Sequence, residues 1–195
     1  HIASIKQQLQ EEYEYVFLVD AGDHIQGTAY GSMDKGNTII ELMNQTGYDL
    51  ATLGNHEFDY GMEGCMNVIE WANYPYLSCN FYHELDGKRT ENVLDSFMIK
   101  DCGDEKIAFI GITTPESFSK STPAYFQNDK GEYIYGISGG PFGEFLYEDV
   151  QTAIDEAKDA GATYVIGLGH LGVDASSLPY TSEETIANVS GFDAF

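Results

Sequence analysis

Apolar residues recur at helical spacing in four stretches of this chain. Between residues 62 and 69 they fall at positions i, i+3, i+4 and i+7, and residues 150 to 157 repeat the pattern. One apolar face every 3.6 residues is typical of an amphipathic helix. The four faces comprise Ile2, Ile5 and Leu9; Ile39, Ile40 and Met43; Met62, Cys65, Met66 and Ile69; and Val150, Ala153, Ile154 and Ala157. Gly47 and Gly161 follow two of these stretches, where left-handed glycines commonly end helices.

Continuous apolar runs lie between these helices. The runs are Val16–Val19, Leu50–Leu53, Ile107–Ile112 and Tyr164–Leu168. Their lack of polar alternation predicts strands buried on both faces, as in parallel sheets. Strands that alternate with helices indicate an α/β fold, and we predict a layered α/β sandwich with mostly parallel strands. The proline- and glycine-rich segment 114–145 does not follow this rhythm, and we expect an irregular excursion with one hairpin there.

Length and charge narrow the class of protein. A chain of 195 residues can form one domain with a sizeable core. Lys and Arg total 9 against 32 Asp and Glu, a formal net charge of −23, and Arg89 is the sole arginine. Binding to nucleic-acid polymers depends on basic residues, so this surface argues against a nucleic-acid partner. No apolar stretch is long enough for a transmembrane helix. The odd number of cysteines, 3, excludes a fully paired set of disulfides within the chain, and we expect Cys65, in a helix, and Cys79, in a strand, to be buried thiols.

Potential metal ligands follow three of the predicted strands. Asp23 comes shortly after the first run, Asn55 follows the second, and His170 follows the last. Ligands in open α/β sheets bind at the carboxyl ends of strands, so these side chains are expected to meet. The Asn55 neighbours His56 and Asp59 add an imidazole and a carboxylate. This combination favours metal-assisted chemistry over packing.

The chain resembles the metallophosphatase domain of the calcineurin-like phosphoesterases, and within it the bacterial 5'-nucleotidases. The matching motifs are Gly-Asp-His-Ile-Gln-Gly at 22–27, Gly-Asn-His-Glu-Phe-Asp at 54–59 and Gly-His at 169–170. Shorter matches flank them at 35–37, 47–49, 60–61 and 190–193. The resemblance implies a hydrolase that cleaves a phosphate ester with a water activated by two divalent metal ions.

The resemblance also implies a role for each motif residue. Asp23 would bridge the two ions, while Asn55 and His170 would bind one of them; such mixed oxygen and nitrogen donors favour Zn, Mn, Co or Fe. His56 would stabilise charge on the transferred phosphoryl group and, with Asn55, contact the substrate phosphate. Asp59 would orient His56 and keep it protonated. We assign no role to Glu57.

Each of these residues also has a simpler explanation. Asp23 could cap a helix that begins near Gly27, and Asn55 could cap a turn after its strand. His56 and Asp59 could form an ordinary surface hydrogen bond, and His170 could be a core histidine. His24 and His83 have no evident partner, so a solvated or packing role is expected for both.

Two motifs of the family are not found in residues 1–195. The family domain begins with a strand that ends in Asp-x-His, and it carries a Gly-His-x-His motif after the segment that matches 191–195. The C-terminal domain that binds the substrate in the family has no counterpart here either. We therefore interpret the chain as one metallophosphatase domain fragment, 1–195, of a longer protein. The fragment alone is expected to be inactive, to bind at most one ion weakly and to self-associate through an unpaired strand edge.

The sequence is compatible with three functions. The first is a 5'-nucleotidase, with 2',3'-cyclic nucleotides and nucleotide sugars as further substrates. The second is another phosphodiesterase or a nuclease of the same superfamily, although the acidic surface argues against the nuclease. The third is a noncatalytic scaffold or binding module that keeps parts of the motifs. The family resemblance suggests an extracellular, periplasmic or cell-surface location, which the chain itself does not specify.

Overall fold

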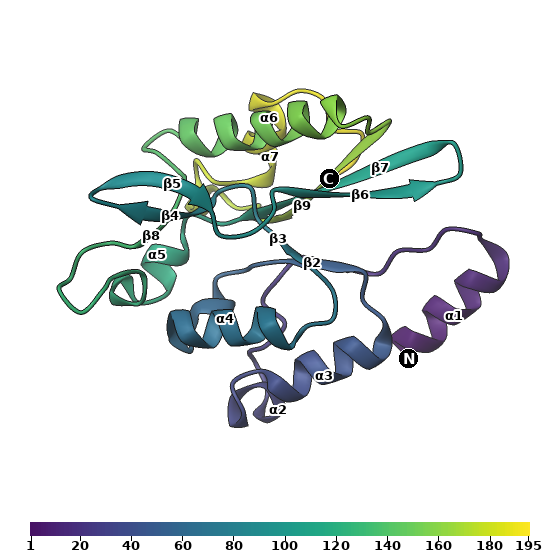
Figure 1. Ribbon diagram of the computed structural model, residues 1–195, viewed down its shortest axis with the longest axis horizontal. Coiled ribbons are helices and arrows are strands. Elements are labelled where there is room, and N and C mark those ends of the chain that lie inside the picture. The colour runs from purple at the N-terminus through teal and green to yellow at the C-terminus, as the bar shows by residue number, and fades with distance from the viewer.

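The computed structural model describes residues 1–195 and arranges them in layers (Figure 1). Three small sheets occupy the middle, with α6 (Glu144–Asp159) and α7 (Ser182–Asn188) above them and α3 (Asn37–Thr46) and α4 (Gly61–Trp71) below. The layered α/β sandwich is therefore confirmed. None of the helices combines the length and the apolar character needed to cross a bilayer.

The first sheet carries two of the three strand ends of interest. It comprises β1 (Val19–Asp20), β2 (Leu50–Thr52) and β3 (Tyr76–Leu77) in the order β1-β2-β3, with both pairings parallel. Of the predicted strand 16–19, only Val19 lies in β1, which continues to Asp20. Since β1 has a neighbour on one side only, both its residues are half-buried rather than fully buried.

Another sheet brings in the third strand end. It comprises β6 (Phe97–Cys102), β7 (Glu105–Thr113) and β9 (Tyr164–His170). β7 pairs antiparallel with β6 and parallel with β9, and Thr113 lies opposite His170 at the end of that ladder. A third sheet, β4 (Phe81–Leu85), β5 (Lys88–Asn92) and β8 (Tyr135–Ile137), is antiparallel throughout. Three strand pairs are parallel and three antiparallel, so the sheets are more mixed than expected.

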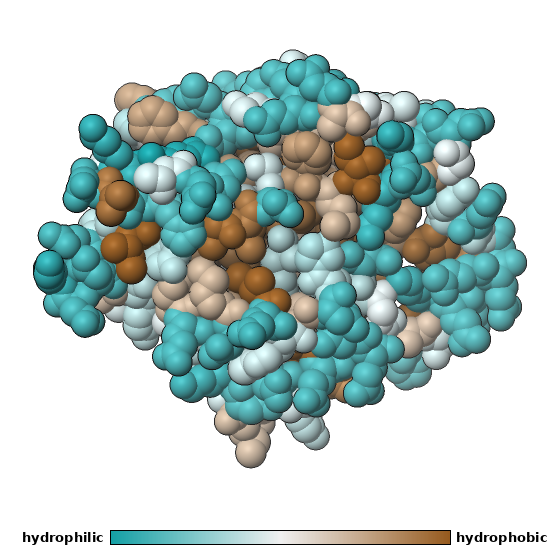
Figure 2. All heavy atoms as spheres, viewed as in Figure 1, coloured by the Kyte–Doolittle hydropathy of each residue, from teal (hydrophilic) through white to brown (hydrophobic).

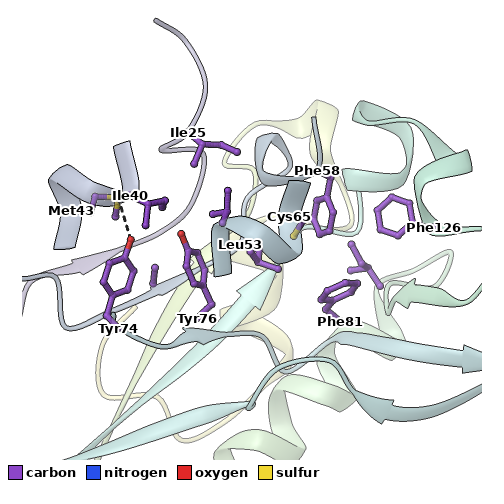
Figure 3. Close-up of a cluster of buried hydrophobic side chains, with 13 residues drawn as sticks. Ile25, Ile40, Met43, Leu53, Phe58, Cys65, Tyr74, Tyr76, Phe81 and Phe126 are labelled. Carbon is purple, nitrogen blue, oxygen red and sulfur yellow. Dashed lines mark hydrogen bonds between the residues drawn. The ribbon is translucent and has the colours of Figure 1, made fainter. Parts of the chain in front are cut away.

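Three apolar clusters hold the layers together. Between the β1-β2-β3 and β6-β7-β9 sheets, Leu50, Leu77, Phe109 and Leu168 pack against one another. α6 buries Leu146, Val150, Ala153, Ile154 and Ala157, and the last four form the face predicted from the sequence. α3 and α4 pack beneath β2 through Ile40, Met43, Cys65 and Val68. In Figure 3 this lower cluster continues through Phe58 to Phe81 and Phe126.

Phe58 links the lower cluster to the candidate site. It belongs to the 3₁₀ helix η1 (His56–Phe58), which directly follows the loop after β2. Its ring is fully buried, with the ring centroid 5.5 Å from that of Phe81 and 5.1 Å from that of Phe126. Burial of one residue of this short helix therefore anchors the polar residues on either side of it.

The predictions for the helix-ending glycines, the two cysteines and the N-terminal helix are confirmed in part. Gly47 and Gly161 adopt positive φ at the ends of α3 and α6, as expected. Cys65 and Cys79 are buried free thiols, and burial raises the pKa of both. Cys79, however, follows β3 instead of lying in a strand. The amphipathic helix α1 (Ile2–Glu12) forms but buries none of its residues.

The remaining elements lie mostly in the connections. α2 (Ala29–Met33) precedes α3, and η3 (Ala175–Ser177) precedes α7. The segment 114–145 is irregular, with α5 (Ser117–Lys120), η2 (Pro123–Phe126) and the short strand β8. The hairpin expected there is limited to one antiparallel bridge between Gln127 and Tyr133, and β8 pairs with the distant β4. Figure 2 shows polar residues over much of one face, with apolar residues gathered in a band across its middle.

Candidate metal centre

Two loops cross at the carboxyl ends of β1 and β2. Gly22, in the first loop, has φ +93°, and an added Cβ there would lie 2.3 Å from the backbone nitrogen of Gly54 in the second. A Cβ on Gly54 would lie 2.2 Å from Oδ1 of Asp23. Both positions therefore require glycine for the loops to touch. This approach places Asp23 beside the Asn55–His56 segment.

Asp23 contacts His170 across the sheet ends. Its Oδ2 lies 3.2 Å from Nε2 of His170, the last residue of β9. The Nδ1–H of His170 donates to the carbonyl of Ala21, at 2.8 Å, which turns Nε2 toward the carboxylate. Such a backbone partner on the second ring nitrogen is typical of histidines that bind metals. Residues 147 positions apart in the chain thus face each other.

The contact shifts the ionisation of both partners. Burial by itself would raise the pKa of Asp23, but hydrogen bonds from His170 and from the backbone of His56 outweigh it, and the pKa is lowered. Burial by itself would lower the pKa of His170, but the hydrogen bond to Asp23 and the charge of that carboxylate, with smaller contributions from Ala21 and Glu57, together outweigh it, and the pKa is raised. A cation that replaced the proton on Nε2 would find the imidazole nitrogen and the carboxylate oxygen facing each other.

The donor geometry fits a metal ion. Bonds of about 2.0 to 2.2 Å, at angles of about 90° to 110°, place two ligand atoms of one ion about 2.8 to 3.6 Å apart. The Asp23–His170 separation of 3.2 Å lies in this range. Asn55 is 9% exposed, and its side chain makes no capping hydrogen bond. The structure contains no group of three His, Cys, Asp or Glu side chains arranged for a metal.

His56 and Asp59 lie at opposite ends of η1. The Nδ1 of His56 is 2.7 Å from Oδ2 of Asp59, and the two side chains are 37% and 27% exposed. The hydrogen bond to Asp59 raises the pKa of His56 against a smaller effect of burial. The backbone N–H of His56 meanwhile donates to Oδ1 of Asp23, at 2.9 Å. The dyad is therefore tied directly to the Asp23 loop.

The capping explanations for Asp23 and Asn55 are wrong. The residue before α2 is Thr28, and Asp23 accepts from His56 and not from that helix. The Asn55 side chain caps nothing although the residue precedes η1. His170 is partly exposed, with 24% of its side chain accessible, so it is not a core histidine.

Sequence reasoning missed two buried neighbours of the site. His24 is almost fully buried; its Nδ1 lies 2.7 Å from Asp20 and its Nε2 2.6 Å from the Tyr76 hydroxyl. The expected packing role holds, but His24 does have partners. Glu57 is fully buried and binds backbone of both crossing loops. The sequence feature that could have indicated the burial of Glu57 is its position directly before the apolar residue Phe58 in a short polar helix.

Comparison with known proteins identifies the family of this chain. Residues 1–194 match the model of the calcineurin-like phosphoesterases. The snake venom 5'-nucleotidase of Gloydius brevicauda is 34% identical over 171 residues, which cover 85% of this chain and 26% of that protein. The bovine (Bos taurus) 5'-nucleotidase is 31% identical over 183 residues, covering 91% of this chain and 29% of that protein. The chain therefore spans just over a quarter of the length of these relatives.

The fold also resembles that of a solved calcineurin-like phosphoesterase. The calcineurin-like phosphoesterase YfkN of Bacillus subtilis superposes with a TM-score of 0.75 at 26% identity, over 99% of this chain and 60% of that one. Because the family model extends over residues 1–194 and the fold follows a member of the family over nearly its whole length, the chain belongs to the calcineurin-like phosphoesterase family.

Proposed function

We propose that this chain is the metal-binding part of a phosphomonoesterase that acts on nucleoside 5'-monophosphates. The observation that carries the proposal is the convergence of Asp23 and His170 at the strand ends, with the His56–Asp59 dyad attached to Asp23 through the backbone of His56. The choice of nucleotides rests on relatives that are 5'-nucleotidases. Calcineurin-like chemistry uses two divalent ions, of which Asp23 would hold both.

The proposed roles follow from the donors. Asp23, Asn55 and His170 would hold one ion, and the resemblance assigns the remaining ligands to motifs that residues 1–195 do not contain. When bound, such ions lower the pKa of a water and neutralise phosphate oxygens. The chain itself positions the carboxylate, because His56 N–H and His170 both bind Asp23.

His56 would act on the transferred group. Its raised pKa favours the imidazolium near neutral pH, since Asp59 accepts from Nδ1 and stabilises the charged form. Nε2 then remains free to donate to a phosphoryl oxygen or to the leaving oxygen, where negative charge develops. Asn55, in the adjacent position, would contact the same phosphate.

Chelation provides the first test. The natural full-length polypeptide, treated exhaustively with EDTA, should lose hydrolysis of AMP and regain it with Mn²⁺ or Zn²⁺. Asp23→Ala should lose bound metal and activity together, because its carboxylate would be the donor shared by both ions. Asp129→Ala, an exposed loop carboxylate, is the matched control and should behave as wild type.

A comparison of two substrates distinguishes a phosphomonoesterase from a phosphodiesterase. AMP should be cleaved faster than bis-p-nitrophenyl phosphate, a diester that reports phosphodiesterase activity. Turnover that survives exhaustive chelation would exclude metal-dependent hydrolysis. Faster cleavage of the diester would instead reassign the chain to a phosphodiesterase of the same family.

A further inference from the structure

Glu57 joins the two loops that carry the candidate ligands. Its Oε2 accepts the backbone N–H of Gly54 at 2.6 Å and that of Asp23 at 2.8 Å. The first bond lies within its own loop, whereas the second reaches 34 residues back in the chain. The side chain is fully buried, so water does not compete for either bond. Charge-assisted bonds to backbone N–H groups are among the stronger hydrogen bonds in proteins.

Asp23 completes the connection in the opposite direction. Its Oδ1 accepts the N–H of His56, so two carboxylates each bind the backbone of the other loop. Asp23 also has φ +66°, a left-handed conformation that is uncommon for a residue with a side chain. Such backbone persists where its surroundings fix it. The bond from Asp23 N–H to Glu57 is the direct restraint on that conformation.

The second oxygen of Glu57 costs stability. Oε1 is buried without a hydrogen-bond partner, and the nearest cationic group, Nδ1 of His24, is 3.8 Å away. His24 is itself held by Asp20 and Tyr76. A half-satisfied buried carboxylate is unfavourable compared with an apolar side chain. Fold stability alone therefore does not explain a glutamate at this position.

We propose that Glu57 is a positioning residue of the metal centre, which fixes the backbone of Asp23 so that its carboxylate faces His170. The inference rests on the proposed function of Asp23 and His170 as metal ligands. Outer-shell groups that orient ligands typically contribute about 10- to 100-fold to metal affinity or activity. Glutamate has the reach to span both loops from η1; aspartate would be one methylene shorter.

Two variants of Glu57 and one control test the inference in the natural full-length polypeptide. Glu57→Gln keeps the shape of the side chain but replaces the two charge-assisted bonds to Gly54 N–H and Asp23 N–H by weaker neutral ones, whereas Glu57→Ala removes both bonds. Because Glu57→Ala can fail to fold, the glutamine variant carries the test. Asp34→Asn is the matched control: Asp34 also binds backbone, through Thr38 N–H, and also has one buried oxygen without a partner, but it lies outside the site.

The measurements are Mn²⁺ affinity by electron paramagnetic resonance, melting temperature, and kcat and KM for AMP. We expect Glu57→Gln to bind Mn²⁺ about 10- to 100-fold more weakly than wild type, and saturating Mn²⁺ to restore much of its kcat. Asp34→Asn should keep wild-type Mn²⁺ affinity at a comparable loss of melting temperature.

Equal Mn²⁺ affinity in wild type and Glu57→Gln would overturn the inference, and so would an equal loss of affinity in Asp34→Asn. Absence of any Mn²⁺ binding by the wild type would overturn it as well. A wild-type protein that binds Mn²⁺ without hydrolysing AMP would refute the proposed nucleotidase function, while the Mn²⁺ affinities would still decide the role of Glu57.

Discussion

At the residue scale, the His56–Asp59 pair is a local structure. The two residues are three positions apart, and the single 3₁₀ turn between them sets their side chains at hydrogen-bonding distance. The buried Phe58 fixes this turn in the core, and the His56 N–H fixes it to Asp23. A group held so rigidly can favour the transition state without paying for its own ordering.

We predict that His56→Ala lowers kcat for AMP by about 10²- to 10⁴-fold, the usual contribution of a positioned acid or charge stabiliser. Metal content should be unchanged, because His56 contacts Asp23 through its backbone alone. Asp59→Asn should act in the same direction with a smaller effect. Metal analysis beside steady-state kinetics checks both points, and stoichiometric loss of metal in His56→Ala would show that the histidine is a ligand.

At the element scale, two amphipathic helices with similar patterns have different environments. α6 buries its apolar face against β6 and β7, and Ile154 is fully buried there. α1 leaves Ile2, Ile5 and Leu9 exposed by 51%, 55% and 40%. A polar contact holds α1 instead: the Lys6 ammonium binds Oδ2 of Asp49 at 2.7 Å and the carbonyl of Gly47.

This difference predicts unequal effects of the same substitution. In the 195-residue chain, Ile154→Ala should lower the free energy of unfolding by about 2 to 5 kcal/mol, since it leaves a cavity in the core. Ile5→Ala should change it by less than about 0.5 kcal/mol, as is usual for exposed positions. Urea unfolding followed by circular dichroism measures both. A cost above 1 kcal/mol for Ile5→Ala, on the scale of ordinary core effects, would mean that α1 packs more tightly than described.

At the scale of the whole molecule, charge and exposed apolar surface act against each other. The net charge of −23 repels a second copy at low ionic strength. The apolar side of α1, together with Val16, Phe17 and Leu18, lines an open groove of about 110 Å³ beside the edge strand β1. Exposed apolar surface next to an unpaired strand edge favours association.

Association of the 195-residue chain should therefore increase with salt. The screening length falls from about 10 Å at 0.1 M to about 3 Å at 1 M ionic strength, so repulsion weakens while the apolar contact does not. Light scattering across a NaCl series should show a rise in mean mass. Leu9→Lys, which adds a charge to the groove, should suppress that rise, and a strictly monomeric wild type at 1 M NaCl would contradict the prediction.

The sequence by itself determined the features that depend on near neighbours along the chain. Apolar spacing located α3, α4 and α6, and glycines after α3 and α6 marked their ends because left-handed backbone favours glycine. The position of Asp23, Asn55 and His170 after apolar runs indicated where a site would form. The spacing of His56 and Asp59 allowed their hydrogen bond within a single turn.

Only the tertiary structure decided which distant groups meet. The pattern of α1 could not reveal that nothing in residues 1–195 covers its apolar face, and β8 carries no signal that it pairs with β4. The hydrogen bond from Asp23 N–H to Glu57 joins residues 34 positions apart. The 3.2 Å contact between Asp23 and His170 joins residues 147 positions apart. Such contacts depend on how the layers pack and how closely two glycines let the loops approach, and neither is encoded in local spacing.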